Sequence, residues 1–544
     1  TLDVTVNPDF GQVEADPATL NLTAFETFLS ERRPFFVEGT GLYRFELNCY
    51  IVVDCSTNEG LFYSRRIGRS PVLRDDYGDA ATPTATPIAT ALKVTGRTAR
   101  GLSFGVLDAV TPRVAGPGST TVEPRTNYAV ISTEQDLRGG QAGVRVIGTA
   151  VHRALDEWTD PFLHASAYAT GVSVRNRMFG GNYELAGSFA ASRVSGSAAA
   201  IARTQRGAVH YYQQPGDDVV LDTTRTSLTG HAVHVKFGKY GGGITRFETS
   251  FVRQSPGFEV NDLGYLRRAD LQDWSTWASL ALNTPTRLYR WLRVNANHWR
   301  TWNTSGVQLS NAFNTNFHMG LHSNWSVHAG ATVNGLGAIY CDRCTRGGPM
   351  LRESRAIYPW FGVEGDGRRM LVPYLWVNLA RGDDGRSASV SVSPTLGLRF
   401  STRFDAEIGM DLTRNHDHTQ WLGNYTEGDV THHAFARLEQ RTVSLNLRGN
   451  YTVAPNLTVE LYAEPFVSTG TYSDFRELSA TPAAADYDAR FMAYTPPPDA
   501  DTAFRVRQLR TNAVLRWEYR PGSTLYLVWA HGREANEAIR SDRA

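Results

Sequence analysis

Residues 387–400 read SASVSVSPTLGLRF, and apolar and polar side chains alternate through them with Pro394 as the one break. A β-strand points successive side chains to opposite faces, so this stretch forms a strand with one apolar and one polar face. The same alternation returns at residues 403–412, 442–453, 457–464 and 512–519. The chain is therefore predicted to be all-β, and the open question is which solvent the apolar faces meet.

The connections between the predicted strands alternate between tight turns and mostly long loops. The tight turns lie near residues 100–101, 139–140, 179–181, 240–243, 283–286, 320–323, 400–403, 454–456 and 520–523. The long connections are 8–87, 112–126, 192–224, 255–271, 335–356, 415–431 and 470–503, with short exceptions near 301–305 and 382–386. Tight turns at one rim and long loops at the other are typical of bacterial outer-membrane barrels. A sandwich has no reason to keep this order, and a propeller would show a period of about 40–50 residues.

The predicted fold is thus a large antiparallel transmembrane β-barrel that spans residues 1–544. Its apolar parity would face lipid, and its polar parity would face a lumen that holds the mid-strand charges Arg403, Asp405 and Glu407. Such charges would be costly in a dry core, and backbone groups in lipid must pair within a closed sheet. Tryptophans near the strand ends, such as Trp325, Trp517 and Trp529, suit an interfacial girdle.

We count about 21 strands, the first near residues 1–7 and the last near 522–533, whereas single-chain bacterial barrels normally have an even number. We therefore expect segments outside these residues to complete a barrel of about 24 strands. No amphipathic helix of ordinary length is predicted, apart from a turn or two near residues 18–31.

Composition excludes several other classes of protein. The net charge is +1, which gives no global field for binding nucleic acid. No apolar run is long enough for a membrane helix. No nucleophile elbow, P-loop or HExxH motif is present, so the sequence gives no indication of an enzyme.

The four cysteines form two local pairs, Cys49 with Cys55 and Cys341 with Cys344. Close pairs in a β-rich chain predict two disulfides and an oxidising compartment. Half of a zinc site is the alternative for the second pair, but no second CxxC or local histidine accompanies it.

Several segments outside the strands are more distinctive than the alternation. These are NPDFGQVEADP at residues 7–17, ERRPFFVEG at 31–39, LFYSRRIGR at 61–69 and SPGFEVNDLGY at 255–265. With them, nearly the whole chain resembles the DUF5916 family, in which a carbohydrate-binding-module-9-like domain commonly precedes a region that looks like an outer-membrane barrel. The resemblance implies a bacterial outer-membrane location. It names no activity, although the preceding domain makes saccharides a candidate solute.

Residues 8–87, called the insert below, are too long for an ordinary hairpin loop and are rich in Arg, Glu, Asp and Phe. We interpret the insert as a plug, whose arginines would pair with lumenal carboxylates such as Asp405 and Glu407 or hold anionic solutes. The alternative is that its charges only pair with one another and fix its shape. The candidate pore and plug residues are Asp9, Glu14, Asp16, Glu26, Arg32, Arg33, Glu38, Arg65, Arg66, Arg69, Arg403, Asp405 and Glu407.

Two groups of residues are candidate metal ligands. Asp9, Glu14 and Asp16 offer oxygens that suit calcium, although the EF-hand spacing is absent and a polar turn is the alternative. The second group brackets one predicted external loop and would suit a transition metal, unless it is only polar surface. It consists of His416, Asp417, His418, His432 and His433.

Three functions follow from this architecture. The first is a porin-like channel or gated uptake pore for small polar solutes, with outer-membrane lipid as its surroundings. The second is an outer-membrane anchor for a surface or secretion assembly, with protein partners at external loops such as 192–224, 335–356 and 470–503. The third is an outer-membrane hydrolase, which no linear motif supports.

Overall fold

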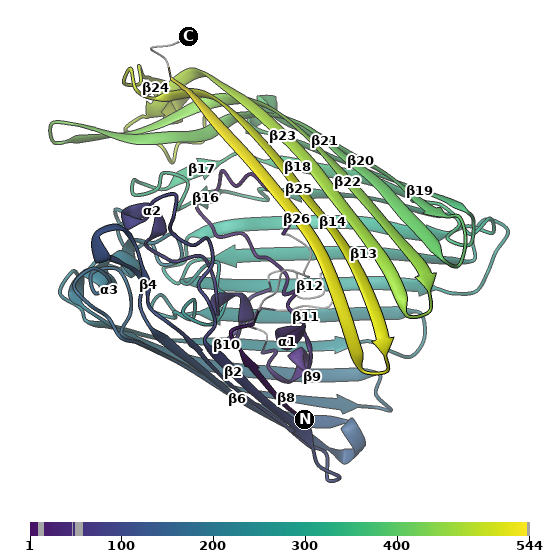
Figure 1. Ribbon diagram of the computed structural model, residues 1–544. Coiled ribbons are helices and arrows are strands. Elements are labelled where there is room, and N and C mark those ends of the chain that lie inside the picture. The colour runs from purple at the N-terminus through teal and green to yellow at the C-terminus, as the bar shows by residue number, and fades with distance from the viewer. Residues whose placement is uncertain (9–15, 46, 49–57, 541–544) are drawn as a thin grey trace. The chain divides into compact units, whose positions relative to one another are not determined.

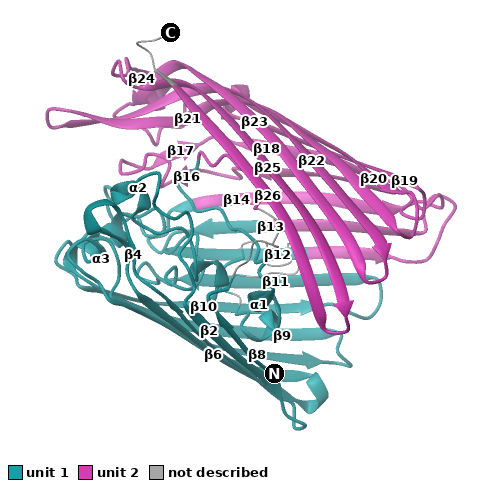
Figure 2. Cartoon of the chain, in the orientation of Figure 1, with its two compact units in different colours: residues 1–9, 23–277, 299–308 teal, residues 10–22, 278–298, 309–544 magenta. Residues whose placement is uncertain are grey.

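The computed structural model describes residues 1–8, 16–45, 47–48 and 58–540 of the chain (Figure 1). Within them, 22 strands belong to one antiparallel sheet, and two short hairpins form sheets of their own. The chain divides into unit 1, residues 1–9, 23–277 and 299–308, and unit 2, residues 10–22, 278–298 and 309–544 (Figure 2). None of the described helices has the length and apolarity needed to cross a membrane.

In unit 1, each long strand pairs antiparallel with the next one along the chain, and β1 pairs with β2. The strands are β1 (Leu2–Val6), β2 (Thr90–Arg97), β3 (Leu102–Thr111), β6 (Thr126–Leu137), β7 (Ala142–Arg153), β8 (Ser166–Met178), β9 (Tyr183–Ser195), β10 (Ser227–Lys239) and β11 (Thr245–Gln254). The connections hold the hairpin β4 (Val114–Ala115) and β5 (Thr121–Glu123), and the helices α1 (Pro34–Val37), α2 (Arg74–Tyr77) and α3 (Ala198–Arg206).

The residues of β12 (Leu271–Leu282), β13 (Trp291–Trp302) and β14 (Gln308–Gly320) are divided between the two units. Unit 2 continues the antiparallel meander from β14 to β26, with β24 paired to β23. Its strands are β15 (Ser326–Asn334), β18 (Ala356–Glu364), β19 (Leu371–Gly382), β20 (Ser387–Arg399), β21 (Phe404–Glu427), β22 (Val430–Ala454), β23 (Leu457–Leu478), β24 (Phe491–Ala493), β25 (Asp501–Arg520) and β26 (Ser523–Arg540). The hairpin of β16 (Ile339–Cys341) and β17 (Leu351–Glu353) lies in one of its long loops.

The two faces of the sheet in unit 2 differ as the alternation predicts. One apolar row crosses seven strands in register, with Leu461 55% and Trp529 60% exposed. Its members are Leu371, Leu398, Ala406, Gly449, Leu461, Ala513 and Trp529.

The opposite face of unit 2 is polar and carries part of the insert. Thr442 and Ser468 hydrogen-bond across the β22–β23 pair at 2.8 Å. Residues 16–22 lie against this face, where the backbone N–H of Ala18 donates to Glu464 Oε2 at 3.0 Å and Ala18 packs on Phe466. The polar parity is therefore the side on which this segment of the insert lies.

Unit 1 shows the same division with one difference. Its outward row Val146, Val172 and Phe189 is apolar and exposed, as expected. The opposite face, however, is buried by the insert and the long loops and is only partly polar. One of its rows, in register over six strands, is Lys93, Leu107, Val130, Thr149, Ala169 and Ser192. A folded insert packs on apolar side chains, so alternation weakens on the strands beneath it.

Aromatic side chains gather at the tight-turn ends of the strands. In unit 2, Phe400 stacks on Phe404, and Phe404 contacts Tyr451, with ring centroids 5.7 and 6.2 Å apart. In unit 1, Tyr183 and Phe237 stack at 6.1 Å beside the tight turns that follow β8 and β10. Such clusters suit the girdle that was predicted from the tryptophans.

All 21 predicted strands overlap strands of the sheet, but two expectations about connections are wrong. Residues 415–431 are not a loop, because β21 and β22 continue through them to a tight turn between Glu427 and Val430. Two register shifts in this hairpin disturb the alternation that would have revealed it. No helix forms at residues 18–31, and the nine-residue α3 forms instead in the 192–224 connection, capped by the Ser197 side chain. Completion of the barrel by other segments stays a prediction.

Candidate functional site

The insert is anchored to unit 1 by backbone pairing with a distant loop. Gly60 and Tyr265 form an antiparallel bridge with hydrogen bonds of 3.0 and 2.9 Å, and the Tyr63 N–H donates to Leu263 O at 2.7 Å. Phe28 packs against the rings of Tyr63 and Tyr265, at centroid distances of 4.8 and 5.1 Å. Two segments singled out in the sequence, 61–69 and 255–265, are thus direct partners.

The insert arginines pair mainly with carboxylates of the insert itself. Arg66 holds Glu26 through two hydrogen bonds of 2.8 Å and donates to Gly264 O. Arg33 pairs with Glu31 at 2.7 Å and also donates to the carbonyls of Ser64 and Ile67. For Arg33 and Arg66, this arrangement matches the alternative interpretation, in which the charges fix the shape of the insert.

The other predicted insert residues have more varied surroundings. Arg65 donates to Ser30 O, with Glu31 at 4.0 Å. Arg69 lies 3.9 Å from Glu123 of β5. The backbone N–H of Arg32 donates to the Glu31 side chain. Glu38 is exposed, and its backbone carbonyl accepts a hydrogen bond from a lysine of β2.

Lys93 on β2 joins the sheet to the insert and was not identified from the sequence. Its side chain is 1% exposed, and its ammonium donates to Phe35 O at 2.8 Å and to Glu38 O at 2.9 Å. Asp3 of β1 lies 3.3 Å away and balances the charge. A single lysine within an alternating strand carries no sequence signal that would show whether it contacts the insert or solvent.

Two glycines of the wall give aromatic residues of the insert their seats. A Cβ on Gly171 would lie 2.6 Å from the Phe45 ring and 2.7 Å from Leu61, and a Cβ on Gly105 would lie 2.9 Å from the Tyr43 ring. The Tyr43 hydroxyl donates to Val106 O at 3.1 Å. The wall of unit 1 is therefore shaped for the insert.

A buried charge cluster ties together the long loops of unit 1. Asp262 accepts from Arg153 at 2.5 Å and contacts His164 Nδ1 at 2.8 Å, while His164 Nε2 lies 2.7 Å from Thr204 Oγ1 of α3. Burial alone would raise the pKa of Asp262. The neighbouring His164 and Arg153 outweigh it and hold this pKa well below its ordinary value. Burial likewise opposes charging of His164, but Asp262 raises its pKa above 6.5. We call this group, Arg153, His164, Thr204 and Asp262, the loop cluster.

The buried carboxyl of Glu59 is expected to make the docking of the insert on the rest of unit 1 depend on pH. It is 6% exposed and accepts from Gln254 and from the Arg267 N–H, and burial raises its pKa to about 7. The docked state therefore holds this proton more tightly than the undocked state, and docking weakens as pH rises from about 4.5 through 7. We expect Glu59→Gln to remove this dependence and to stabilise docking at pH 8 by up to about 3 kcal/mol.

Hydrogen exchange of residues 58–67 at pH 5 and pH 8 measures this effect. The wild-type chain should lose protection at the higher pH, and Glu59→Gln should keep it. Equal pH dependence in both proteins would show that Glu59 does not control docking.

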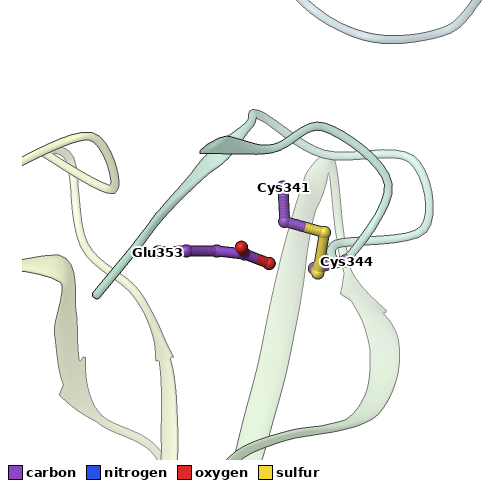
Figure 3. Close-up of side chains that lie close together, drawn as sticks. All are labelled: Cys341, Cys344 and Glu353. Atoms are coloured by element: carbon purple, nitrogen blue, oxygen red, sulfur yellow. A yellow bond between two sulfur atoms is a disulfide. The ribbon is translucent and has the colours of Figure 1, made fainter. Parts of the chain in front are cut away.

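Loops and strand ends of unit 2 line a cavity of about 320 Å³. One of these loops contains the predicted disulfide between Cys341 and Cys344 (Figure 3). Among the His, Cys, Asp and Glu side chains of the described part of the chain, Cys341, Cys344 and Glu353 are the one set of three close enough to share an ion. The sulfurs are bonded to each other, so in this state they are not thiolate ligands.

The predicted histidine group does not assemble, because the long β21–β22 hairpin separates its members. His416 pairs with Glu439 and His432 with Glu477, both at 2.5 Å. His418 contacts Tyr487, His433 contacts Asn424, and Asp417 accepts from the Thr419 N–H.

The remaining candidates divide into two groups. Asp9, Glu14, Cys49 and Cys55 lie outside the described residues, so the calcium site and the first disulfide stay predictions. On unit 2, Arg403, Asp405 and Glu407 are exposed, and Asp405 accepts from Asn450 at 3.0 Å. Asp16 belongs to the segment that lies on the polar face of unit 2.

Comparisons with known proteins give one family and several distant structures. The family model described as "Domain of unknown function (DUF5916)" matches residues 1–542. No curated protein matches.

Three of the similar solved structures have TM-scores between 0.27 and 0.42. A mutant of the ferric enterobactin receptor PfeA from Pseudomonas aeruginosa is 9% identical, with 80% of this chain and 72% of that chain covered and a TM-score of 0.42. The outer membrane protein OpdK of the same organism is 12% identical over 79% of this chain and 98% of that one, with a TM-score of 0.32. An anion-selective porin from Comamonas acidovorans is 9% identical over 61% and 91%, with a TM-score of 0.27.

Proposed function

This chain belongs to the DUF5916 family, and we propose that it is a bacterial outer-membrane β-barrel that conducts small polar solutes, saccharides among them, past a lumenal plug formed by residues 8–87. The observation that carries the proposal is the chemical difference between the two faces of the sheet. The apolar parity is exposed along many consecutive strands, whereas the described parts of the insert pack on the other parity in each unit.

An apolar surface of this extent favours hydrocarbon as its solvent. Burying one Leu or Val side chain stabilises a protein by about 1.5–3 kcal/mol, so a wall of such residues in water is costly. Backbone groups on a lipid-facing wall must pair within the sheet, which the continuous antiparallel registers achieve for neighbouring strands.

Bilayer recordings test the channel. Val6 and Thr90 are register partners of the β1–β2 pair, so residues 7–89 can be replaced by a two-residue Asn-Gly turn that keeps this register. We expect the full chain to conduct weakly, and the deletion variant to conduct severalfold more because the plug is gone.

A matched control shortens an external connection instead, by removing residues 213–220, and should conduct like the full chain. Absence of conductance both in the full chain and after the deletion would reject the channel.

One observation favours the alternative of an anchor for a surface assembly. In unit 2 the β21–β22 hairpin and the 335–356 and 470–503 connections share a small core of Leu351, Phe435, Tyr487 and Phe491. A folded platform at the ends of long loops suits a protein partner. Purification from gently solubilised membranes would return a stoichiometric partner if the anchor function holds, and the chain alone if it does not.

A further inference from the structure

Unit 1 contains a cavity of about 310 Å³ between residues 41–45 of the insert and the sheet. Strands β6 to β10 form its wall, near the ends that carry tight turns. The volume is at the lower end of the range found for small-molecule sites. Gly41 contributes open space, since a Cβ on it would have no atom within 4 Å.

Two cross-strand rows of the polar parity line this cavity. One row consists of Glu134, Arg145, Ser173, Ser188 and His234. The other consists of Gly143, Arg175, Ala186 and Lys236, and its register continues beyond the lining to Asp136 of β6. Both rows are fixed by backbone registers, so the side chains converge from a rigid wall.

Cations outnumber carboxylates around the cavity. Arg145 pairs with Glu134, Arg175 lies 3.0 Å from Asp136, and Arg177 pairs with Glu184 at 2.9 Å. These pairs account for the three nearby carboxylates. Lys236 of β10 also lines the cavity, so the wall carries one cation more than these pairs balance.

Lys236 is the residue that points most clearly to a ligand. It is half-buried, and across the described ranges its ammonium has no hydrogen-bond or ion-pair partner. A partly desolvated ammonium favours an anion beside it. Phe45 adds an aromatic residue to the lining, which suits a ligand with a short apolar body.

We propose that this cavity binds a small organic carboxylate, whose oxygens are held by Lys236 and by the guanidinium groups of Arg145 and Arg175. The ligand carboxylate would complete the charge balance of the wall. This assignment deepens the proposed channel function and rests on it for the route by which the anion arrives.

Titration calorimetry of the full chain in detergent, with sodium butyrate as the probe, tests the site without requiring conductance. Lys236→Gln should weaken butyrate binding about tenfold, because it removes one charge-assisted hydrogen bond. Lys239→Gln is the matched control, since Lys239 lies on the same strand at the opposite parity and donates to Thr245 at 2.7 Å. It should leave binding unchanged.

Two further ligands define the chemistry. Neutral 1-butanol should bind at least tenfold more weakly than butyrate, and inorganic phosphate should not bind more tightly than butyrate. Absence of butyrate binding, equal affinity in Lys236→Gln, equal affinity for butanol, or tighter binding of phosphate would each overturn the assignment.

The calorimetry tests the carboxylate site and the bilayer recordings test the channel, so a negative result in one does not decide the other. A conducting chain that does not bind butyrate would keep the channel and reject this site. A chain that binds butyrate but never conducts would support the site's chemistry and reject the channel.

Discussion

Asp262→Asn is expected to destabilise the long loops of unit 1 by about 3–5 kcal/mol, the cost of removing one partner from a buried ion pair. Arg153, whose side chain is 1% exposed, would lose its charge partner, and His164 would lose the carboxylate on its Nδ1. Hydrogen exchange of residues 154–165 and 255–270 measures the loss. The sheet should keep its protection, because its registers do not depend on the loop cluster.

Asp222→Asn is the matched control, since Asp222 pairs with Arg225 in the same loop region but both side chains are more than 40% exposed. An exposed pair contributes about 0–1 kcal/mol, so this variant should differ little from the wild-type chain. Equal effects of the two variants would show that the loop cluster does not stabilise the loops.

The loop cluster also has a defined pH window. The pKa of His164 is raised, so its contribution is fully present below about 6.5 and is lost as pH rises through the higher value of the folded state. The pKa of Asp262 is lowered, so its contribution is present above its unfolded value and is lost only in strong acid. Protection of the loops should therefore fall as pH rises above about 6.5, and less so in His164→Gln.

Lys93→Met is expected to release the insert, with a loss of docking free energy of about 3 kcal/mol. The variant keeps the length of the side chain but leaves Asp3 and the carbonyls of Phe35 and Glu38 without their donor. Trypsin should then cleave the insert at Arg65 and Arg66 under conditions in which the wild-type chain resists. Conductance should rise toward that of the deletion variant.

Lys239→Met controls for the loss of a lysine, because Lys239 contacts Thr245 and not the insert. It should leave proteolysis and conductance unchanged. Resistance of Lys93→Met to trypsin would show that the aromatic seats at Gly105 and Gly171 hold the insert without Lys93.

Period-two alternation and turn residues were sufficient to predict every long strand, because both are local signals. They failed at residues 415–431, where register shifts break the alternation, and at α3, whose helix is short and lies within a long loop. They also could not show which inward positions lie beneath the insert. Leu107 and Val130 are buried there although they share a face with Lys93.

The sequence predicted which residue types make up the site, but not which of these residues contact one another. The sequence identified the charged insert and its arginines, yet Arg66 pairs with Glu26 rather than with a residue of the wall. The loop cluster joins positions separated by 98 and 109 residues in the chain, and no spacing rule reports such pairs. The seats at Gly105 and Gly171 depend on close approach of aromatic rings, which only coordinates reveal.

The claim that the apolar face of the sheet meets lipid is tested most directly by the accessibility of spin labels along β23 after reconstitution into lipid vesicles. Labels would be attached at Thr458→Cys, Val459→Cys, Glu460→Cys and Leu461→Cys, which lie on alternating faces of one strand. We expect oxygen, which partitions into lipid, to relax the labels at 459 and 461, and a water-soluble nickel complex to relax those at 458 and 460. Equal exposure of all four labels to the nickel complex, or a chain that stays in water without detergent, would contradict this claim.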